Sequence, residues 1–244
     1  MKSILITMNG YLKGFIFLIR PHLLLGWLRH PFLLTSNILR LTHWMAQQDR
    51  KNIFNDFYSA KRDYAKRYQL YTYIIDTQSL RDKPFDYLEF GVSRGDSIKW
   101  WVSNCTHKET RFFGFDTFEG LPEDWGTFKK GAMAANVPAI DDTRVQFVKG
   151  LFQESVPKFL SAYPVNHATR KVIHLDADLF SSTLYALTIL APYLTKGDIL
   201  MFDEFNVPNH EFYAFQCFCE SYYIRTKLFG AVNNYFQVAM IITE

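Results

Sequence analysis

Apolar positions follow two different periods along this chain. Between residues 85 and 202, short apolar runs alternate with segments in which apolar residues recur every three or four positions. The short runs predict strands at Phe85–Phe90, Arg111–Phe115, Val145–Val148, Lys171–Leu175 and Ile199–Phe202. The periodic segments predict helices at Asp96–Ser103, Ser155–Tyr163 and Thr183–Leu194. Such alternation is typical of βαβ units, so we expect a parallel sheet with helices on both faces.

The segments on either side of this region follow other patterns. Between Asp49 and about Leu80, aromatic and aliphatic residues recur at helical steps, so we expect a helical segment there. Near the C-terminus, the runs Tyr222–Phe229 and Tyr235–Thr243 flank Asn233-Asn234, which is typical of a tight turn. These runs predict an antiparallel pair of strands that closes the otherwise parallel sheet.

The composition is that of a folded globular chain. Of 244 residues, 48% are apolar and 21% are charged, and the net charge of +3 is too small to indicate a nucleic-acid partner. The cysteines, Cys105, Cys217 and Cys219, are odd in number and follow no C-x-x-C spacing, so we expect neither a disulfide scaffold nor a cysteine metal site. Reduced thiols are typical of the cytoplasm, which is the expected location.

Positive charge is concentrated at the N-terminus. Residues 1–48 contain no acidic side chain and five basic ones, which are Lys2, Lys13, Arg20, Arg29 and Arg40. The segment is rich in Ile, Leu and Phe, but no apolar run reaches the roughly 20 residues that cross a bilayer. We therefore expect a helical extension at 1–48 in front of a main domain at 49–244. Its helices either lie peripherally on the inner membrane surface or pack on the main domain or on a second copy in a homo-oligomer.

A glycine-containing turn follows the first predicted strand. The run Glu89-Phe90-Gly91-Val92-Ser93-Arg94-Gly95-Asp96-Ser97 places two glycines between that strand and a helix. Glycines let a ligand approach the backbone, and the helix N-terminus offers free N–H groups. The spacing is not the dinucleotide fingerprint G-x-G-x-x-G. Its E-x-G-x-x-x-G form is typical of methyltransferases that use S-adenosylmethionine, and a plain tight turn is the alternative.

Further candidate residues follow the next two strands. Asp116, 27 residues after Glu89, is placed to accept hydrogen bonds from two ribose hydroxyls, or else to cap a turn. The long stretch Thr117–Arg144 is expected to be either a surface insertion or a lid over an acceptor, formed by Glu119, Trp125, Phe128, Lys129 and Lys130. The run Gly150-Leu151-Phe152-Gln153 borders the adenine in such folds, with Phe152 for stacking and Gln153 for an edge hydrogen bond.

Acidic residues follow two neighbouring strands. Asp176-Ala177-Asp178 comes directly after the strand at 171–175, and Asp203-Glu204 after the strand at 199–202. The carboxyl ends of neighbouring parallel strands meet at one edge of a sheet, where ligands bind. Oxygen ligands suit Mg²⁺, Mn²⁺ or Ca²⁺, and clustered carboxylates repel one another without a cation. We favour a metal site over the alternative, in which these acids cap helices.

Three stretches carry motifs beyond what fold rules demand. They are Glu89-Phe90-Gly91-Val92 with Arg94-Gly95, then Phe115-Asp116-Thr117-Phe118-Glu119-Gly120-Leu121-Pro122, then Leu175-Asp176-Ala177-Asp178-Leu179-Phe180 with Asp203-Glu204. Through these motifs, roughly residues 67 to 220 resemble the macrocin O-methyltransferase (TylF-like) family of sugar O-methyltransferases. The Asp-Thr-Phe-Glu-Gly-Leu-Pro piece is the most specific of them.

The resemblance implies a fold, a reaction and a set of site residues. The fold would be the Rossmann-like α/β class I methyltransferase fold, with a mostly parallel seven-stranded sheet and a C-terminal antiparallel hairpin. The reaction would be Mg²⁺-dependent methyl transfer from S-adenosylmethionine to a sugar hydroxyl of a glycoside or glycan, with Mn²⁺ as a substitute. The metal ligands would be Asp176, Asp203 and Glu204. The cofactor would contact Glu89, Phe90, Gly91, Val92, Gly95, Ser97, Asp116, Thr117, Gly150, Phe152 and Gln153.

Some positions depart from the family pattern. The family usually has Asp-Gly-Asp at 176–178, an aspartate at Glu204 and an arginine at His174. The general base is open between Asp176, Asp178 and His174, with His210 as a further alternative. Leu179 stands where catechol-type methyltransferases place a lysine, so we expect no lysine base.

Two other functions compete with methyl transfer. An apolar strand followed by Asp-x-Asp, as in Lys171–Asp178, is also typical of metal-dependent glycosyltransferases that bind nucleotide sugars. The glycine turn, Asp116 and the second acidic pair favour methyl transfer over that function. The third possibility is a binding protein that keeps only the fold, and the intact acids argue against it.

Overall fold

An eight-stranded sheet forms the centre of the computed structural model, which describes residues 2–163, 165 and 168–244. The strand order is β1-β7-β8-β6-β5-β2-β3-β4, and every neighbouring pair is parallel except the two that β8 makes. The strands are β1 (Phe54–Asn55), β2 (Phe85–Phe90), β3 (Arg111–Asp116), β4 (Val145–Lys149), β5 (Arg170–Leu175), β6 (Ile199–Phe202), β7 (Thr226–Val232) and β8 (Gln237–Ile242).

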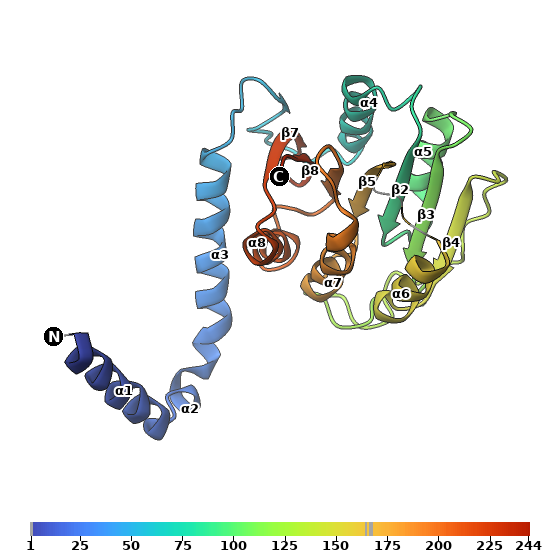
Figure 1. The fold of residues 1–244 in the computed structure, drawn as a ribbon. Helices are drawn as coiled ribbons and strands as arrows, with labels where there is room; N and C mark the ends of the chain where they lie inside the picture. Colours follow the sequence, from blue (N-terminus) through green and yellow to red (C-terminus); the bar gives the residue numbers. More distant parts are fainter. Residues whose placement is uncertain (1, 164, 166–167) are drawn as a thin grey trace.

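Helices cover both faces of this sheet (Figure 1). One face packs against α4 (Lys66–Gln78) and α5 (Asp96–Asn104), and the other against α6 (Phe152–Ala162), α7 (Phe180–Leu190) and α8 (Glu211–Tyr222). The central strand β2 is buried at all six positions because it has helices on both sides and strands at both edges. Four of its six residues are apolar, and the sequence pattern located it by them, although the buried strand also contains Asp86 and Glu89.

Most of the predicted elements are confirmed within one to three residues. The strands at 85–90 and 199–202 have the predicted bounds, and the C-terminal runs form the antiparallel pair β7–β8 around Asn233-Asn234. Two predictions are wrong. The sheet has eight strands instead of seven, because β1 adds a two-residue parallel partner to β7. The helical segment expected from Asp49 begins only at Lys66, and the chain before it is extended or irregular.

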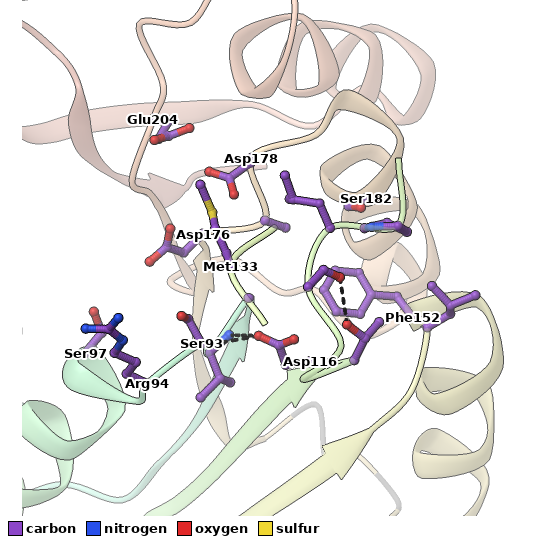
Figure 2. A pocket seen from close by; sticks show the side chains of 18 of the residues that line it. Ser93, Arg94, Ser97, Asp116, Met133, Phe152, Asp176, Asp178, Ser182 and Glu204 are labelled. Atoms are coloured by element: carbon purple, nitrogen blue, oxygen red, sulfur yellow. Dashed lines mark hydrogen bonds between the residues drawn. The ribbon is translucent and has the colours of Figure 1, made fainter. Parts of the chain in front are cut away.

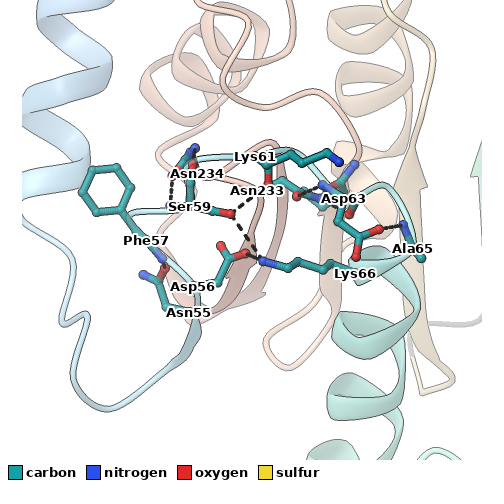
Figure 3. Close-up of polar contacts among 11 residues, drawn as sticks. Asn55, Asp56, Phe57, Ser59, Lys61, Asp63, Ala65, Lys66, Asn233 and Asn234 are labelled. Carbon is teal, nitrogen blue, oxygen red and sulfur yellow. Dashed lines mark hydrogen bonds and ion pairs between the residues drawn. The ribbon is translucent and has the colours of Figure 1, made fainter.

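The chain between β1 and α4 is fastened to the turn of the C-terminal hairpin (Figure 3). Asn234 accepts a hydrogen bond from the Ser59 N–H (2.8 Å) and donates one to the Ser59 carbonyl (2.7 Å). Asn233 makes the same pair of bonds with the backbone of Asp63, at 3.0 and 2.9 Å. Two asparagine amides therefore replace the backbone partners that a helix would have supplied to this segment.

The N-terminal helices extend away from the sheet (Figure 1). They are α1 (Lys2–Ile19), α2 (His22–Leu25), a 3-10 turn at Gly26–Leu28, and α3 (Arg29–Ala46). Only the second half of α3 packs on the domain: Trp44 lies 5.0 Å from the Phe205 ring, and Leu41 is buried. Within the described part of the chain, no helix combines the length and apolar character needed to cross a membrane.

Candidate active site

A pocket of about 620 Å³ opens at the carboxyl ends of β2, β3, β5 and β6. Figure 2 shows acidic side chains at one end of it, where Asp176, Asp178 and Glu204 lie. Asp116 and Phe152 lie at the other end. The two ends differ in chemistry, and the turn that follows β2 joins them.

Gly91 brings this turn against the strand β5. Its φ of +93° lies in the left-handed region, and a Cβ built there would come within 1.8 Å of the Asp176 carbonyl oxygen. The Gly91 N–H donates to the Phe115 carbonyl at 2.9 Å. No residue with a side chain fits this position, so the glycine is required for β2, β3 and β5 to converge on the pocket.

Asp116 holds the same turn in place. One carboxylate oxygen accepts hydrogen bonds from the backbone N–H groups of Val92 and Ser93, both at 2.8 Å, and the other accepts from Phe118 at 2.7 Å. The turn-capping role considered for Asp116 is therefore present in the structure. Each carboxylate oxygen has about two acceptor sites, so the oxygen bonded to Phe118 retains one site for a hydroxyl donor from the pocket that Asp116 lines.

The predicted cofactor residues divide into two groups. Seven of them line the pocket: Gly91, Val92, Ser97, Asp116, Thr117, Phe152 and Gln153. Four lie outside its lining: Glu89, Phe90, Gly95 and Gly150. Phe90 is in the core, stacked on Phe115 at 4.8 Å, and Gly95, with φ of +76°, precedes the N-terminus of α5. Glu89 is 1% exposed and accepts a hydrogen bond from Tyr87 at 2.6 Å.

The acidic end combines carboxyl groups from two strand ends. Asp176 and Asp178 follow β5, and Glu204 follows β6; all three line the pocket. Asp203 lies behind them, with no exposed surface, and accepts a hydrogen bond from the Tyr64 hydroxyl at 2.5 Å. Glu211 of α8 is also fully buried and accepts from the Glu204 N–H at 2.8 Å.

Burial and mutual repulsion make these carboxyl groups hard to ionise. Burial, followed by repulsion from Asp203 and Asp178, raises the pKa of Asp176 well above its usual range. Burial and the adjacent Asp178 raise the pKa of Glu204 to about 9, and burial also raises the pKa of Asp178. A positive ion among these groups would reverse both effects.

Unpaired oxygen atoms mark the same place. Among the described residues, three buried carboxylate oxygens here have no hydrogen-bond partner: Oδ1 of Asp203, Oε2 of Glu204 and Oε1 of Glu211. Buried polar atoms without a partner are costly and therefore rare in folded proteins. Oxygen-only ligand sets suit hard divalent cations, so the residues present fit a Mg²⁺-type ion.

One group of possible metal ligands differs from the predicted set. Ligand atoms of His174, Asp176 and Asp203 lie within 4.8 Å of one another, whereas Glu204 lies beside Asp178. His174 is 1% exposed and outside the pocket lining, with Tyr87 at 2.8 Å from Nδ1 and Tyr71 at 3.4 Å from Nε2. In this enclosed position His174 lies close to Asp176 but does not line the pocket.

Among the pocket residues that were not predicted from the sequence, two lie against the carboxyl groups. Tyr64 and Arg67 line the acidic end, and the Arg67 guanidinium lies 4.6 Å from the Tyr64 ring centroid. Tyr64 fits an apolar helical pattern, so it gave no signal of its own. Arg67 did give a signal, because it is a charge on the side of α4 that buries Leu70, Tyr71 and Ile74.

The long connection between β3 and β4 lies partly over the pocket. Its residues Thr117, Gly120, Leu121, Pro122, Glu123 and Met133 belong to the lining. Glu123 accepts a hydrogen bond from the Ser181 hydroxyl at the start of α7 (2.7 Å). None of the five side chains expected to cover an acceptor lines the pocket; Glu119 instead pairs with Lys149 at 3.1 Å, and Lys129 with Asp124 at 2.7 Å.

This fold and pocket agree with what is known of similar proteins. Residues 88–205, which run from β2 to just beyond the second acidic pair, match a family model described as a methyltransferase domain. This part of the chain is similar to methyltransferase domains. The family resemblance expected from the sequence motifs is thereby confirmed, and the matched range contains both the glycine turn and the strand-end acids.

A curated relative and two solved structures extend the comparison. An enzyme of Streptomyces olivaceus, 8-demethyl-8-(2,3-dimethoxy-alpha-L-rhamnosyl)-tetracenomycin-C 4'-O-methyltransferase, is 28% identical over an alignment of 165 positions that covers 58% of this chain and 61% of that protein. The calicheamicin methyltransferase CalS11 is 22% identical with a TM-score of 0.59 over 85% of this chain and 91% of its own. The O-methyltransferase NovP is 18% identical with a TM-score of 0.56 over 73% and 79%. These structures confirm the Rossmann-like methyltransferase fold.

Proposed function

We propose that this protein transfers a methyl group from S-adenosylmethionine to a sugar hydroxyl of a glycoside or glycan, with the help of a divalent cation. The observation that carries the proposal is the pocket itself, which joins a glycine turn capped by Asp116 to a cluster of incompletely paired carboxyl groups. The tetracenomycin relative, named for methylation of a rhamnosyl 4'-hydroxyl, supports a deoxysugar as the acceptor class.

The cofactor would occupy the end of the pocket formed by the glycine turn. Asp116 would accept hydrogen bonds from the ribose hydroxyls, Phe152 would stack on the adenine, and Gln153 would bond its edge. Gly91 keeps the turn directly against the backbone of Asp176 and so joins this end of the pocket to the acidic end. The methyl donor would therefore be bound beside the acidic end.

The acidic end would bind the cation through Asp176, Asp203 and Glu204. A divalent ion held there would orient the acceptor hydroxyls and lower their proton affinity. The unpaired oxygens of Asp203 and Glu204 supply the acceptor capacity for it. Tyr64 fixes the Asp203 carboxylate by donating to its other oxygen.

The protein's own groups would align the reacting atoms and remove the hydroxyl proton. Methyl transfer is an in-line displacement, so holding acceptor oxygen and methyl carbon in line supplies much of the rate enhancement. Asp178 lines the pocket at the acidic end, and burial raises its pKa, which makes it a stronger base than an ordinary carboxylate. We assign the proton to Asp178 in preference to His174, which is enclosed by Tyr71 and Tyr87.

The catalytic unit would comprise residues 49–244, with 1–48 as a separate helical extension. The family model begins inside that unit, and the pocket lining runs from Tyr64 to Glu204. The competing glycosyltransferase function is not favoured, because Asp176-Ala177-Asp178 falls within the methyltransferase match.

Calorimetry separates these functions. We expect binding of S-adenosylmethionine and S-adenosylhomocysteine and no binding of a nucleotide sugar at the cofactor end. Transfer of a labelled methyl group to rhamnosides in the presence of Mg²⁺ would then establish the reaction. Binding of the nucleotide sugar without binding of S-adenosylmethionine or S-adenosylhomocysteine would overturn the proposal.

A further inference from the structure

Residues 5–36, the described side chains of an N-terminal arm, present an apolar surface that the rest of the described molecule does not cover. Large side chains of this N-terminal arm are exposed along its whole described length, for example Leu12 (58%), Leu24 (79%), Trp27 (73%) and Phe32 (67%). Monomeric soluble proteins rarely leave so continuous an apolar surface open. Figure 1 shows α1 and α2 projecting beyond the domain.

Helix α1 of the arm has two chemically different faces. Leu5, Met8, Leu12, Phe15 and Ile19 are spaced by alternating steps of three and four residues, so they lie on one face. The small and polar residues Thr7, Gly10, Lys13 and Gly14 lie together on the opposite side, along with the exposed Ile6 and Phe17. A helix whose polar residues gather on one side suits an interface between an apolar medium and water.

Charge decides between the two partners that such a face suits. Lys13, Arg20 and Arg29 belong to the arm, and the first 48 residues contain no acid to pair with them. A second copy of the arm would therefore bring like charges together. An anionic lipid surface would neutralise them, with an attraction of about 1 kcal/mol for each basic residue near it.

We propose that residues 2–36 bind peripherally to the surface of a membrane that contains anionic lipids. The apolar face of α1, the leucines of α2 and Trp27 enter the headgroup boundary, while the basic side chains contact lipid phosphates. No helix of the described chain spans a bilayer, which agrees with binding along the surface.

The attachment point places the pocket near that surface. Asn37 of α3 donates a hydrogen bond to Asn209 at 2.9 Å, and Asn209 lies in the connection between β6 and α8 that begins with Asp203 and Glu204. Its neighbour His210 contacts Trp125 of the connection over the pocket (ring centroids 6.4 Å apart). The arm thus leaves the domain beside the carboxyl ends of the strands, where the pocket opens. A lipid-carried sugar would meet the pocket there, an extension that rests on the methyl transfer proposed above.

Vesicle binding by the full-length protein tests the proposal. We expect it to sediment with vesicles of mixed phosphatidylcholine and phosphatidylglycerol at low salt, and to stay in the supernatant with pure phosphatidylcholine. Lys13→Gln and Arg20→Gln should each weaken binding by about fivefold, the change that about 1 kcal/mol per charge produces. The exposed Lys83 and Lys108 lie outside the arm, and their Gln variants should bind like the parent chain.

Two further variants keep the test decisive. Phe15→Gln should abolish binding without changing the melting temperature, because this side chain is 59% exposed. Tyr222→Gln removes an exposed aromatic outside the arm (45% exposed) and should leave binding unchanged. Trp27 fluorescence should shift to the blue on anionic vesicles, and Trp27→Phe should remove that shift.

Two outcomes would overturn the proposal. One is a full-length protein that stays in the supernatant with anionic vesicles at low salt. The other is a dimer in sedimentation velocity that Phe15→Gln dissociates, since the apolar face would then be covered by a second copy. Neither assay contains cofactor or acceptor, so its failure leaves the proposed methyl transfer untouched.

Discussion

The two ends of the pocket differ in how fully their carboxylates are hydrogen-bonded. At the cofactor end, Asp116 is satisfied by three backbone N–H groups of its own chain. At the acidic end, Asp203 and Glu204 each keep an unpaired buried oxygen, and the pKa of Glu204 is raised to about 9 by burial and by Asp178. The cofactor end is completed by the protein's own hydrogen bonds, whereas the acidic end keeps buried carboxylate oxygens without a hydrogen-bond partner.

This difference separates two ways of building a binding site. A site whose polar groups already bond one another is rigid before the ligand arrives and pays little to bind it. In a site with unpaired carboxylates, the fold holds like charges close together, which costs free energy. A bound cation removes this repulsion, so the same free energy contributes to the affinity for the cation. The experiments below test whether the two ends depend on different ligands.

Removal of divalent cations should have the largest effect. We expect EDTA to lower turnover by roughly 100-fold or more, with recovery on addition of Mg²⁺ or Mn²⁺, because the acceptor would lose its orienting ion. Asp203→Asn should fold and bind S-adenosylmethionine normally but lose activity to a similar extent. Labelled methyl transfer and calorimetry would measure the two properties.

The matched control for Asp203→Asn is Asp82→Asn. Asp82 is an exposed acid just before β2, at the opposite end of the strands from the pocket. This variant should keep full activity with Mg²⁺ present. Undiminished turnover of the parent chain in EDTA would show that the acidic end works without a cation.

The cofactor end should respond to Asp116→Ala in a different way. We expect S-adenosylmethionine to bind more weakly by about 1.5–3 kcal/mol, roughly 10- to 150-fold, because hydrogen bonds to a charged group are lost. The melting temperature should also fall, since three backbone donors lose their acceptor. The Mg²⁺ dependence of the melting temperature should be retained. An unchanged cofactor affinity would remove Asp116 from the binding site.

The acidic end should also make stability depend on pH. The pKa of Glu204 is raised from 4.5 to about 9 in the folded protein, so its contribution to stability is present at low pH and is lost as the pH rises between these values. In EDTA, the melting temperature should therefore fall over this range, by about 2–4 °C for each kcal/mol lost. Mg²⁺ should counter the fall, and Glu204→Gln should flatten it. A melting temperature that rises with pH in EDTA would contradict this account.

The smallest effect should come from the contact between the pocket cover and α7. Ser181→Ala removes the hydrogen bond to Glu123, which joins two exposed side chains. We expect KM for the acceptor to rise by about twofold, with kcat and cofactor affinity unchanged. Thr42→Ala, which removes a hydroxyl bond on α3, serves as the comparison and should change none of these constants.

Much of the fold could be predicted because burial leaves a local pattern. The strand Phe85–Phe90 is buried on both faces, so its position is evident from six consecutive residues. The segment before Lys66 could not be predicted in the same way. Phe57 lies 5.7 Å from the Tyr235 ring, so its aromatic character reflects a contact with the end of the chain instead of a helix face. A strand of two residues such as β1 is too short for any period to appear.

The site residues were predictable where acidic side chains stand at the ends of predicted strands. Asp116, Asp176 and Asp203 each stand at or directly after the last residue of a strand, and the parallel sheet brings them to one edge. Tyr64 reaches the site only through a contact between residues 139 positions apart. Glu89 shows the opposite case, because it matches the family motif and yet lies buried beneath the pocket.

The asparagine turn of the C-terminal hairpin sets the order in which the site can be made. Ser59 and Asp63 bond to Asn234 and Asn233 across 175 and 170 positions, so these partners leave the ribosome roughly 10–30 s apart. Until the hairpin emerges, the segment just before Tyr64 lacks the hydrogen bonds with Asn233 and Asn234 that fix it in the folded protein. A nascent chain released after Glu220 would contain every motif of the family and still lack these bonds, so the acidic end is complete only once the C-terminal hairpin has been made.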